Sequence, residues 1–127
     1  MARTLLFLGS IYGFLAVALG AFAAHALRAH VVPEDLEIFK TATTYQLAHS
    51  VVLLIVGVFA LWRPGQGFER AGLAFAIGIL IFSGTLYLLV LTQTRWLGAI
   101  TPIGGVSLLV GWALLAYSIC KSGGPVG

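Results

Sequence analysis

Four long apolar segments occupy most of this chain, and nearly all of its charged residues lie between them. The segments contain no Asp, Glu or Lys, and they cover residues 5–27, 47–62, 71–92 and 97–120. A helix rises about 1.5 Å per residue, so about 20 apolar residues are enough to cross about 30 Å of hydrocarbon. The sequence therefore predicts an all-α, polytopic membrane protein with four transmembrane helices in a bundle.

The composition excludes two broad classes of protein. Hydrophobic residues make up 60% of the chain and charged residues only 9%, whereas a soluble domain usually carries about 25% charged residues. A water-soluble chain of this composition would expose large apolar patches. The seven Lys and Arg residues are scattered singly, so nucleic acid is not an expected partner, while membrane lipids are.

We expect one domain over residues 1–127, with spans at about 5–27, 45–62, 71–92 and 99–119. The first span imitates a signal peptide, because Arg3 precedes an apolar run that ends in small residues. The run is longer than the usual signal-peptide core of about 7–15 residues. We therefore interpret it as a retained transmembrane helix.

The polar stretch 28–46 is the longest connection between spans. Pro33 followed by acidic residues is typical of a helix start, and the apolar residues after it recur at helical spacing. We predict a short amphipathic helix at 33–44, lying at the interface and able to run into the second span. The three acids Glu34, Asp35 and Glu37 are interpreted as a solvated first turn.

Thr101 and Pro102 predict the start of the last helix. Thr can cap free backbone amides, and Pro is favoured at the first helical position. Four spans place both termini on one side of the membrane, together with Arg3, Arg63, Arg70 and Lys121, while the other side holds Arg28, Lys40 and Arg95. The tendency of basic residues to stay in the cytoplasm favours cytoplasmic termini.

Small residues at helical spacing predict close helix packing. In lipid, close packing and interhelical hydrogen bonds replace the hydrophobic effect as the force that joins helices. The stripes can serve packing within the chain or an interface between subunits. The candidate packing residues are Gly9, Gly13, Gly20, Gly72, Gly104 and Gly111.

Ionisable residues inside membrane spans are default functional candidates, and here they are His25 and His49. Both are predicted near the same membrane interface, where His25 could meet a polar face formed by Tyr45, Gln46 and His49. This cluster is either a hydrogen-bonded clasp between the first two helices or a proton or ligand site. The histidines lack a spacing that binds metal, and no carboxylate or Cys completes a set. We therefore expect no metal and no cofactor.

Several motifs of the chain resemble a known family. They are GAFAAHAL at 20–27, YQLAH at 45–49, FSGTLYL at 82–88, LGAITPIGG at 97–105 and GW at 111–112. These resemble the YgdD-like family of small bacterial inner-membrane proteins, which is similar to the eukaryotic transmembrane protein 256 group. The resemblance implies a multi-pass, four-span protein of the cell inner membrane, and it brings no known activity. It adds Ser83, Tyr87 and Thr101 to the candidate polar site.

Two classes of function fit these observations. The first is a structural or interaction bundle that self-associates, as a homo-oligomer, or binds a membrane partner. The second is a small carrier, channel or lipid-binding module with a polar site between the first two helices, although the sequence identifies no small-molecule ligand. An enzyme is not expected, because no nucleophile, base and orienting group can be assembled.

Overall fold

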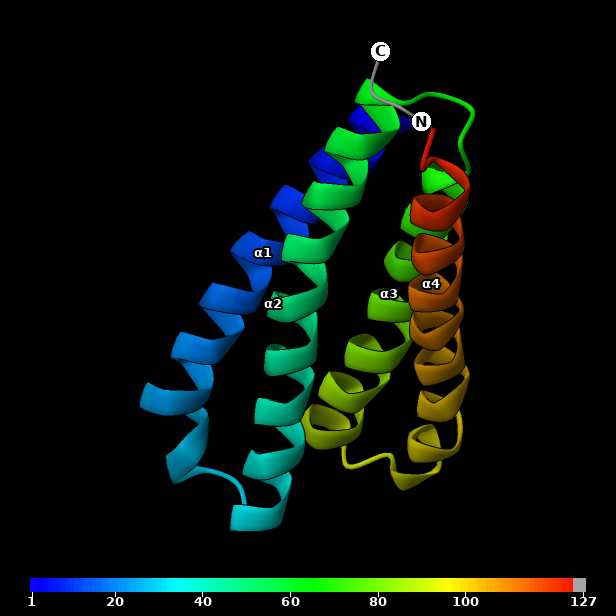
Figure 1. Ribbon diagram of the computed structural model, residues 1–127. Helices are drawn as coiled ribbons and strands as arrows, with labels where there is room; N and C mark the ends of the chain where they lie inside the picture. The colour runs from blue at the N-terminus through cyan, green and yellow to red at the C-terminus, as the bar shows by residue number, and fades with distance from the viewer. Residues whose placement is uncertain (125–127) are drawn as a thin grey trace.

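The computed structural model describes residues 1–124, and within them four long helices are joined by short connections (Figure 1). The helices are α1 (Ala2–His25), α2 (Pro33–Trp62), α3 (Phe68–Thr92) and α4 (Thr101–Lys121), with short 3₁₀ helices η1 (Leu27–Ala29) and η2 (Arg95–Ala99). Each long helix is long and apolar enough to cross a membrane. The predicted all-helical fold with four candidate spans is confirmed.

The predicted amphipathic segment is helical and runs directly into the second span, so that it forms the beginning of α2. α2 starts at Pro33, with Glu34 and Asp35 in its first turn, and continues without interruption to Trp62. No Pro or Gly occurs between Pro33 and Gly57, so nothing in the sequence ends the helix early. Its 30 residues span about 45 Å, which exceeds the hydrocarbon thickness of about 30 Å. The first turns of α2 therefore extend into the interfacial region.

α4 begins at Thr101 and Pro102 as predicted, but without the predicted side-chain cap. Thr101 is the first residue of the helix, Ile100 takes the cap position, and no side chain caps the free amides there. The η2 turn runs directly into α4, and the amide of Ile103 bonds to the Ile100 carbonyl oxygen at 3.0 Å. The prediction that Thr101 caps the helix is therefore wrong, because the preceding 3₁₀ turn already occupies that place.

The helices follow one another through space in chain order. α1 packs mainly on α2, α2 also packs on α3, and α3 packs on α4, so that α1 and α4 lie at the two edges (Figure 1). The α2–α3 turn lies at the same end as the start of α1 and the end of α4 (Figure 1). There, Arg63 Nη1 donates to the Ser122 carbonyl oxygen at 3.0 Å.

Glycines set the closest approaches between helices. A Cβ added at Gly9 would lie 3.0 Å from Leu54 Cδ2, and one added at Gly57 would lie 2.8 Å from Leu6 Cδ2. These two glycines let α1 and α2 pack in direct contact. At the other edge, a Cβ at Gly104 would overlap the backbone of Phe82, so the α3–α4 contact there requires glycine.

The remaining predicted packing glycines divide into two groups. A Cβ at Gly72 would meet Leu5, one at Gly111 would lie 2.7 Å from Phe75 Cδ1, and one at Gly13 would lie 3.4 Å from Ser50 Oγ. An added Cβ at Gly20 would meet nothing within 4 Å. The structure thus places Gly9, Gly13, Gly72, Gly104 and Gly111 at helix contacts and leaves Gly20 on an open surface.

Two apolar cores lie along the bundle, and a layer of polar side chains lies between them. The larger core surrounds Phe68 and Phe75 near the termini, and the smaller one surrounds Phe39 near the opposite end. Residues between these cores along α2 include Gln46 and Ser50, which are buried. This polar layer contains most of the candidate site residues.

Candidate functional site

Gln46 is the centre of the polar layer. Its Nε2 donates to the Tyr12 carbonyl oxygen of α1 at 2.8 Å, and its Oε1 accepts from the Tyr87 hydroxyl of α3 at 2.6 Å. Tyr12 in turn donates its hydroxyl to the Ala76 carbonyl oxygen of α3 at 3.2 Å. Gln46 is only 4% exposed. One amide from α2 therefore joins three helices.

Short hydroxyl side chains add a second bond between α2 and α3 and one between α3 and α4. Ser83 Oγ donates to the Ala42 carbonyl oxygen of α2 at 2.8 Å, and Ser107 Oγ donates to the Ala74 carbonyl oxygen of α3 at 2.7 Å. Hydrogen bonds of this kind between membrane helices are worth about 0.6 kcal/mol on average, and at most about 1.7 kcal/mol.

Thr101 makes one of these interhelical bonds in place of the predicted cap. Its Oγ1 lies 2.7 Å from Thr85 Oγ1 of α3. It also donates to the Leu97 carbonyl oxygen at 3.3 Å. The hydroxyl therefore ties the start of α4 to α3 and to η2.

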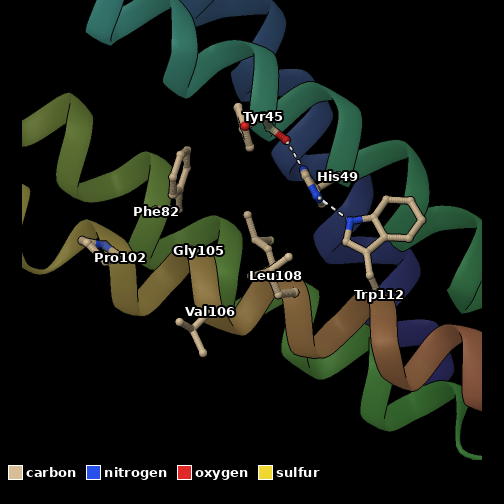
Figure 2. Close-up of a pocket in the computed structure, with 9 residues that line it drawn as sticks. Tyr45, His49, Phe82, Pro102, Gly105, Val106, Leu108 and Trp112 are labelled. Atoms are coloured by element: carbon tan, nitrogen blue, oxygen red, sulfur yellow. Dashed lines mark hydrogen bonds between the residues drawn. The ribbon is translucent and has the colours of Figure 1, made fainter.

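His49 connects α2 with α4. Its Nδ1 lies 2.8 Å from the Tyr45 carbonyl oxygen, and its Nε2 accepts from Trp112 Nε1 at 3.1 Å (Figure 2). A carbonyl oxygen can only accept, so Nδ1 carries a hydrogen and Nε2 presents its lone pair to Trp112. Both ring nitrogens are thus engaged, and the side chain is 8% exposed.

A groove runs beside His49, between α2 and α4. Its volume is about 460 Å³, and it is lined by Tyr45, His49, Phe82, Pro102, Gly105 and Trp112 together with apolar residues of α4. Figure 2 shows Tyr45 and His49 on one wall and Pro102, Gly105 and Trp112 on the other. The Tyr45 and Phe82 rings approach to 4.7 Å between centroids. We call this feature the His49 groove.

The structure does not bring His25 to the other predicted polar residues. His25 is exposed at the end of α1, whereas His49 neighbours Ser50, which packs against Gly13 in the middle of α1. The expectation of equal depth is wrong because α2 begins at Pro33, which places His49 about 24 Å along the helix. His25 also lies on the side of α1 opposite the glycine stripe, and that stripe faces α2.

Several residues of this hydrogen-bond network were not expected from the sequence. Tyr12, Thr85, Ser107 and Trp112 complete the interhelical hydrogen bonds described above. A Tyr or Trp in an apolar span is indistinguishable in sequence from a lipid-facing aromatic residue. Only the relative rotation and shift of the helices identify these residues as partners.

Asp35 corrects another expectation. Its carboxylate is 4% exposed and forms a two-point ion pair with Arg95, with Nη1–Oδ1 at 2.8 Å and Nη2–Oδ2 at 3.0 Å. Gln93 Nε2 donates to Oδ2 at 2.9 Å. Asp35 is thus not solvated, because the segment that follows α3 folds back over the start of α2. Glu34 and Glu37 are exposed, as predicted.

The ion pair depends on an unusual backbone turn. Gln93 ends α3 with φ at 56°, a left-handed conformation that residues other than glycine seldom adopt. This turn directs Gln93 and Arg95 toward Asp35. The pKa of the Asp35 carboxyl is held below its ordinary value, mainly by the hydrogen bond from Arg95 and secondly by the hydrogen bond from Gln93. Asp35 is in the first turn of α2 and Arg95 begins η2, so we expect both to lie in the interfacial region at the ends of the spans.

The described residues contain no cluster of metal-binding side chains. Within residues 1–124, no group of three or more His, Cys, Asp or Glu side chains could hold a metal ion. The site is a set of hydrogen bonds between helices, with a groove beside it.

Comparison with known proteins places these features in a family. The model of a family described as "Protein of unknown function (DUF423)" matches residues 19–105. A UPF0382 membrane protein of Staphylococcus aureus is 41% identical over 96% of this chain and 99% of its own. The UPF0382 membrane protein YwdK of Bacillus subtilis is 38% identical over 94% of this chain and 98% of its own. No solved structure matches.

The match includes α2, α3, most of the polar layer and the first turns of α4. The relatives are named as membrane proteins, in agreement with the four apolar helices. The chain therefore belongs to the DUF423 family of UPF0382 membrane proteins, a family of unknown function.

Proposed function

We propose that this protein is a structural and interaction protein of the membrane, without enzymatic activity, that self-associates through α1. One observation carries the first part of the proposal. Among the described residues, each buried side-chain nitrogen or oxygen has a hydrogen-bond partner within the chain. The interior polar groups are therefore already engaged in hydrogen bonds within the chain, and this supports a fixed bundle over one that holds groups ready for a substrate.

The exposed face of α1 supports self-association. α1 packs mainly against α2, and an exposed face beside this contact presents residues spaced alternately by three and four. This spacing suits a left-handed helix pair. Because two copies in the same membrane orientation run parallel, the small alanines would meet at one end of the face and the phenylalanines would pack together at the other. The exposed residues of this α1 face are Phe7, Ser10, Phe14, Val17, Ala21 and Ala24.

Cysteine crosslinking tests this interface. The only cysteine, Cys120, is first replaced by Ala, and a single Cys is then introduced at Ala21 or, as a matched control, at Ala113 on the exposed face of α4. Oxidation in native membranes is expected to give a covalent dimer with Ala21→Cys and none with Ala113→Cys. Equal crosslinking at both positions, or only monomers in nanodiscs, would refute the α1 interface.

The alternative function, a carrier, channel or lipid-binding module, was predicted to have its polar site between the first two helices, and their close packing argues against that location. Gly9 and Gly57 bring α1 and α2 into direct contact, so the interface between the first two helices is filled there. A cavity of about 160 Å³ does reach Gln46 and Tyr87, between α1 and α3. It is smaller than the roughly 300–1,000 Å³ typical of ligand pockets, and the larger His49 groove lies between α2 and α4, away from the interface of the first two helices.

We further propose that the protein lies in the bacterial inner membrane with both termini in the cytoplasm. The basic residues at the end that holds the termini are Arg3, Arg63, Arg70 and Lys121, and basic residues tend to remain in the cytoplasm. The sequence motifs at 20–27, 45–49, 82–88, 97–105 and 111–112 support an assignment to the YgdD-like branch and its transmembrane protein 256 relatives.

A further inference from the structure

The His49 groove has the length of one membrane leaflet. Along α4 it extends from Pro102, in the first turn, to Trp112, a distance of about 15 Å at 1.5 Å per residue. Half of a hydrocarbon core is also about 15 Å thick. The groove therefore begins at the membrane interface, beside η2, and ends near the middle of the bilayer.

The lining of the groove suits hydrocarbon and not water. Apart from Tyr45 and His49, the residues on its walls are apolar or aromatic. At the inner end of the groove, Trp112 Nε1 donates to His49 Nε2 at 3.1 Å, so these polar atoms already have hydrogen-bond partners. Water would find few partners here, and an apolar cavity does not retain water. An empty groove would forfeit dispersion contacts along both walls.

The groove is continuous with the lipid-facing surface of the protein. Val106 and Leu109 of α4 line it and are 59% and 68% exposed, and Tyr45 on the opposite wall is 45% exposed. In a protein whose helices cross a membrane, this surface meets acyl chains. A chain can thus enter from the side, along the whole length of the groove.

We propose that the His49 groove binds one acyl chain of a phospholipid from the leaflet that borders η2. The chain lies along α4, passes Gly105 and Phe82, and ends against the His49–Trp112 pair. Gly105 allows this path, because an added Cβ there would have only Phe82 Cδ2 within 4 Å, at 3.8 Å. This inference goes beyond self-association and does not depend on it.

Filling the groove tests the proposal. The full chain is reconstituted in nanodiscs with a phospholipid whose acyl chain carries a diazirine, and labelled peptides are located by mass spectrometry. In the unaltered protein we expect labelling concentrated on the α4 segment 102–112 and on Tyr45 or Phe82. Gly105→Phe places a ring in the groove and should abolish this concentrated labelling.

A matched variant distinguishes labelling within the groove from labelling of the lipid-facing surface in general. Ile103 is 60% exposed on the same helix and does not line the groove, so Ile103→Phe should leave the labelling unchanged. Gly105→Leu provides a smaller filling residue should the Phe variant fail to fold, as judged by its helical circular dichroism. Labelling spread evenly over α1 and α4, or equal labelling in a folded Gly105 variant, would overturn the proposal.

Discussion

Gln46 joins three helices through a single amide group, with the Tyr12 carbonyl oxygen on one side and the Tyr87 hydroxyl on the other. In water such bonds would exchange with solvent at small net gain. In hydrocarbon the alternative is an unpaired polar group, which is costly. The polar layer therefore fixes which helices meet and at what height, while the apolar cores on either side fill the remaining space.

Replacing Gln46 by Leu should destabilise the bundle by about 1–2 kcal/mol, because two interhelical bonds are lost and the Tyr87 hydroxyl is left unpaired. The measurement is the free energy of unfolding in mixed detergent micelles. In a double-mutant cycle, Tyr87→Phe should cost less when Gln46 is already Leu. Strict additivity of the two substitutions would show that their hydrogen bond contributes nothing.

Gly104 and Gly20 provide a second test at single positions. Gly104→Ala should destabilise the protein by about 1–3 kcal/mol, because the new methyl group would overlap the Phe82 backbone. Gly20→Ala meets no atom within 4 Å and should change stability by about 0.5 kcal/mol or less. Thermal unfolding of the two variants side by side measures the difference, and equal losses would contradict the close approach of α4 to α3 at Gly104.

At the scale of helices and their connections, the Asp35–Arg95 pair joins the start of α2 to the segment between α3 and α4. The left-handed turn at Gln93 directs this segment toward α2. Arg95 thus holds this connection to α2, and a few residues later the Thr101 hydroxyl bonds to α3. The end of the bundle opposite the termini is held by side chains and not by glycine contacts alone.

The pH dependence of unfolding should report this ion pair. The pKa of Asp35 is lower in the folded protein than its ordinary value of 3.8, so its contribution to stability is present above pH 3.8 and is lost as pH falls through the lower, folded value. Asp35→Asn should be less stable than the unaltered protein at neutral pH, and the difference should shrink in acid. A difference that stays constant with pH would exclude this carboxylate as its source.

At the scale of the whole molecule, the four helices form an open arrangement with α1 and α4 at its edges (Figure 1). α2 and α3 are covered on both sides by other helices, whereas the candidate span that contains α1 has the smallest share of buried residues among the four. This leaves α1 free for a second copy and the space between α2 and α4 free for a lipid chain. The two proposals therefore use different surfaces and can be tested independently.

Reporter fusions after Lys121 should establish the orientation of the whole molecule. With cytoplasmic termini, a green fluorescent protein fusion is expected to fluoresce and an alkaline phosphatase fusion to be inactive, because the phosphatase folds only where disulfides form. The same pair of reporters inserted at Ala29, in the connection between α1 and α2, should give the opposite result. An active phosphatase after Lys121 would contradict the proposed orientation.

Part of this architecture could be predicted because local sequence determines it. The apolar segments predicted the helices, Pro33 and the acids after it predicted the start of α2, and five glycines chosen by spacing lie at helix contacts. The error at His25 arose from placing His49 near the start of the second helix, whereas that helix already begins at Pro33. Asp35 could not be recognised as buried, because Arg95 lies 60 positions away.

The sequence by itself determined that this chain crosses a membrane as helices, since hydrocarbon requires each spanning backbone to satisfy its own amides and only long apolar segments can enter it. The tertiary structure alone decided which polar side chains meet. Their pairing depends on the rotation and sliding of each helix against its neighbours, which follow from where each helix begins and how closely glycines allow it to approach. Gln46 thus meets Tyr87, and His49 meets Trp112 in place of His25.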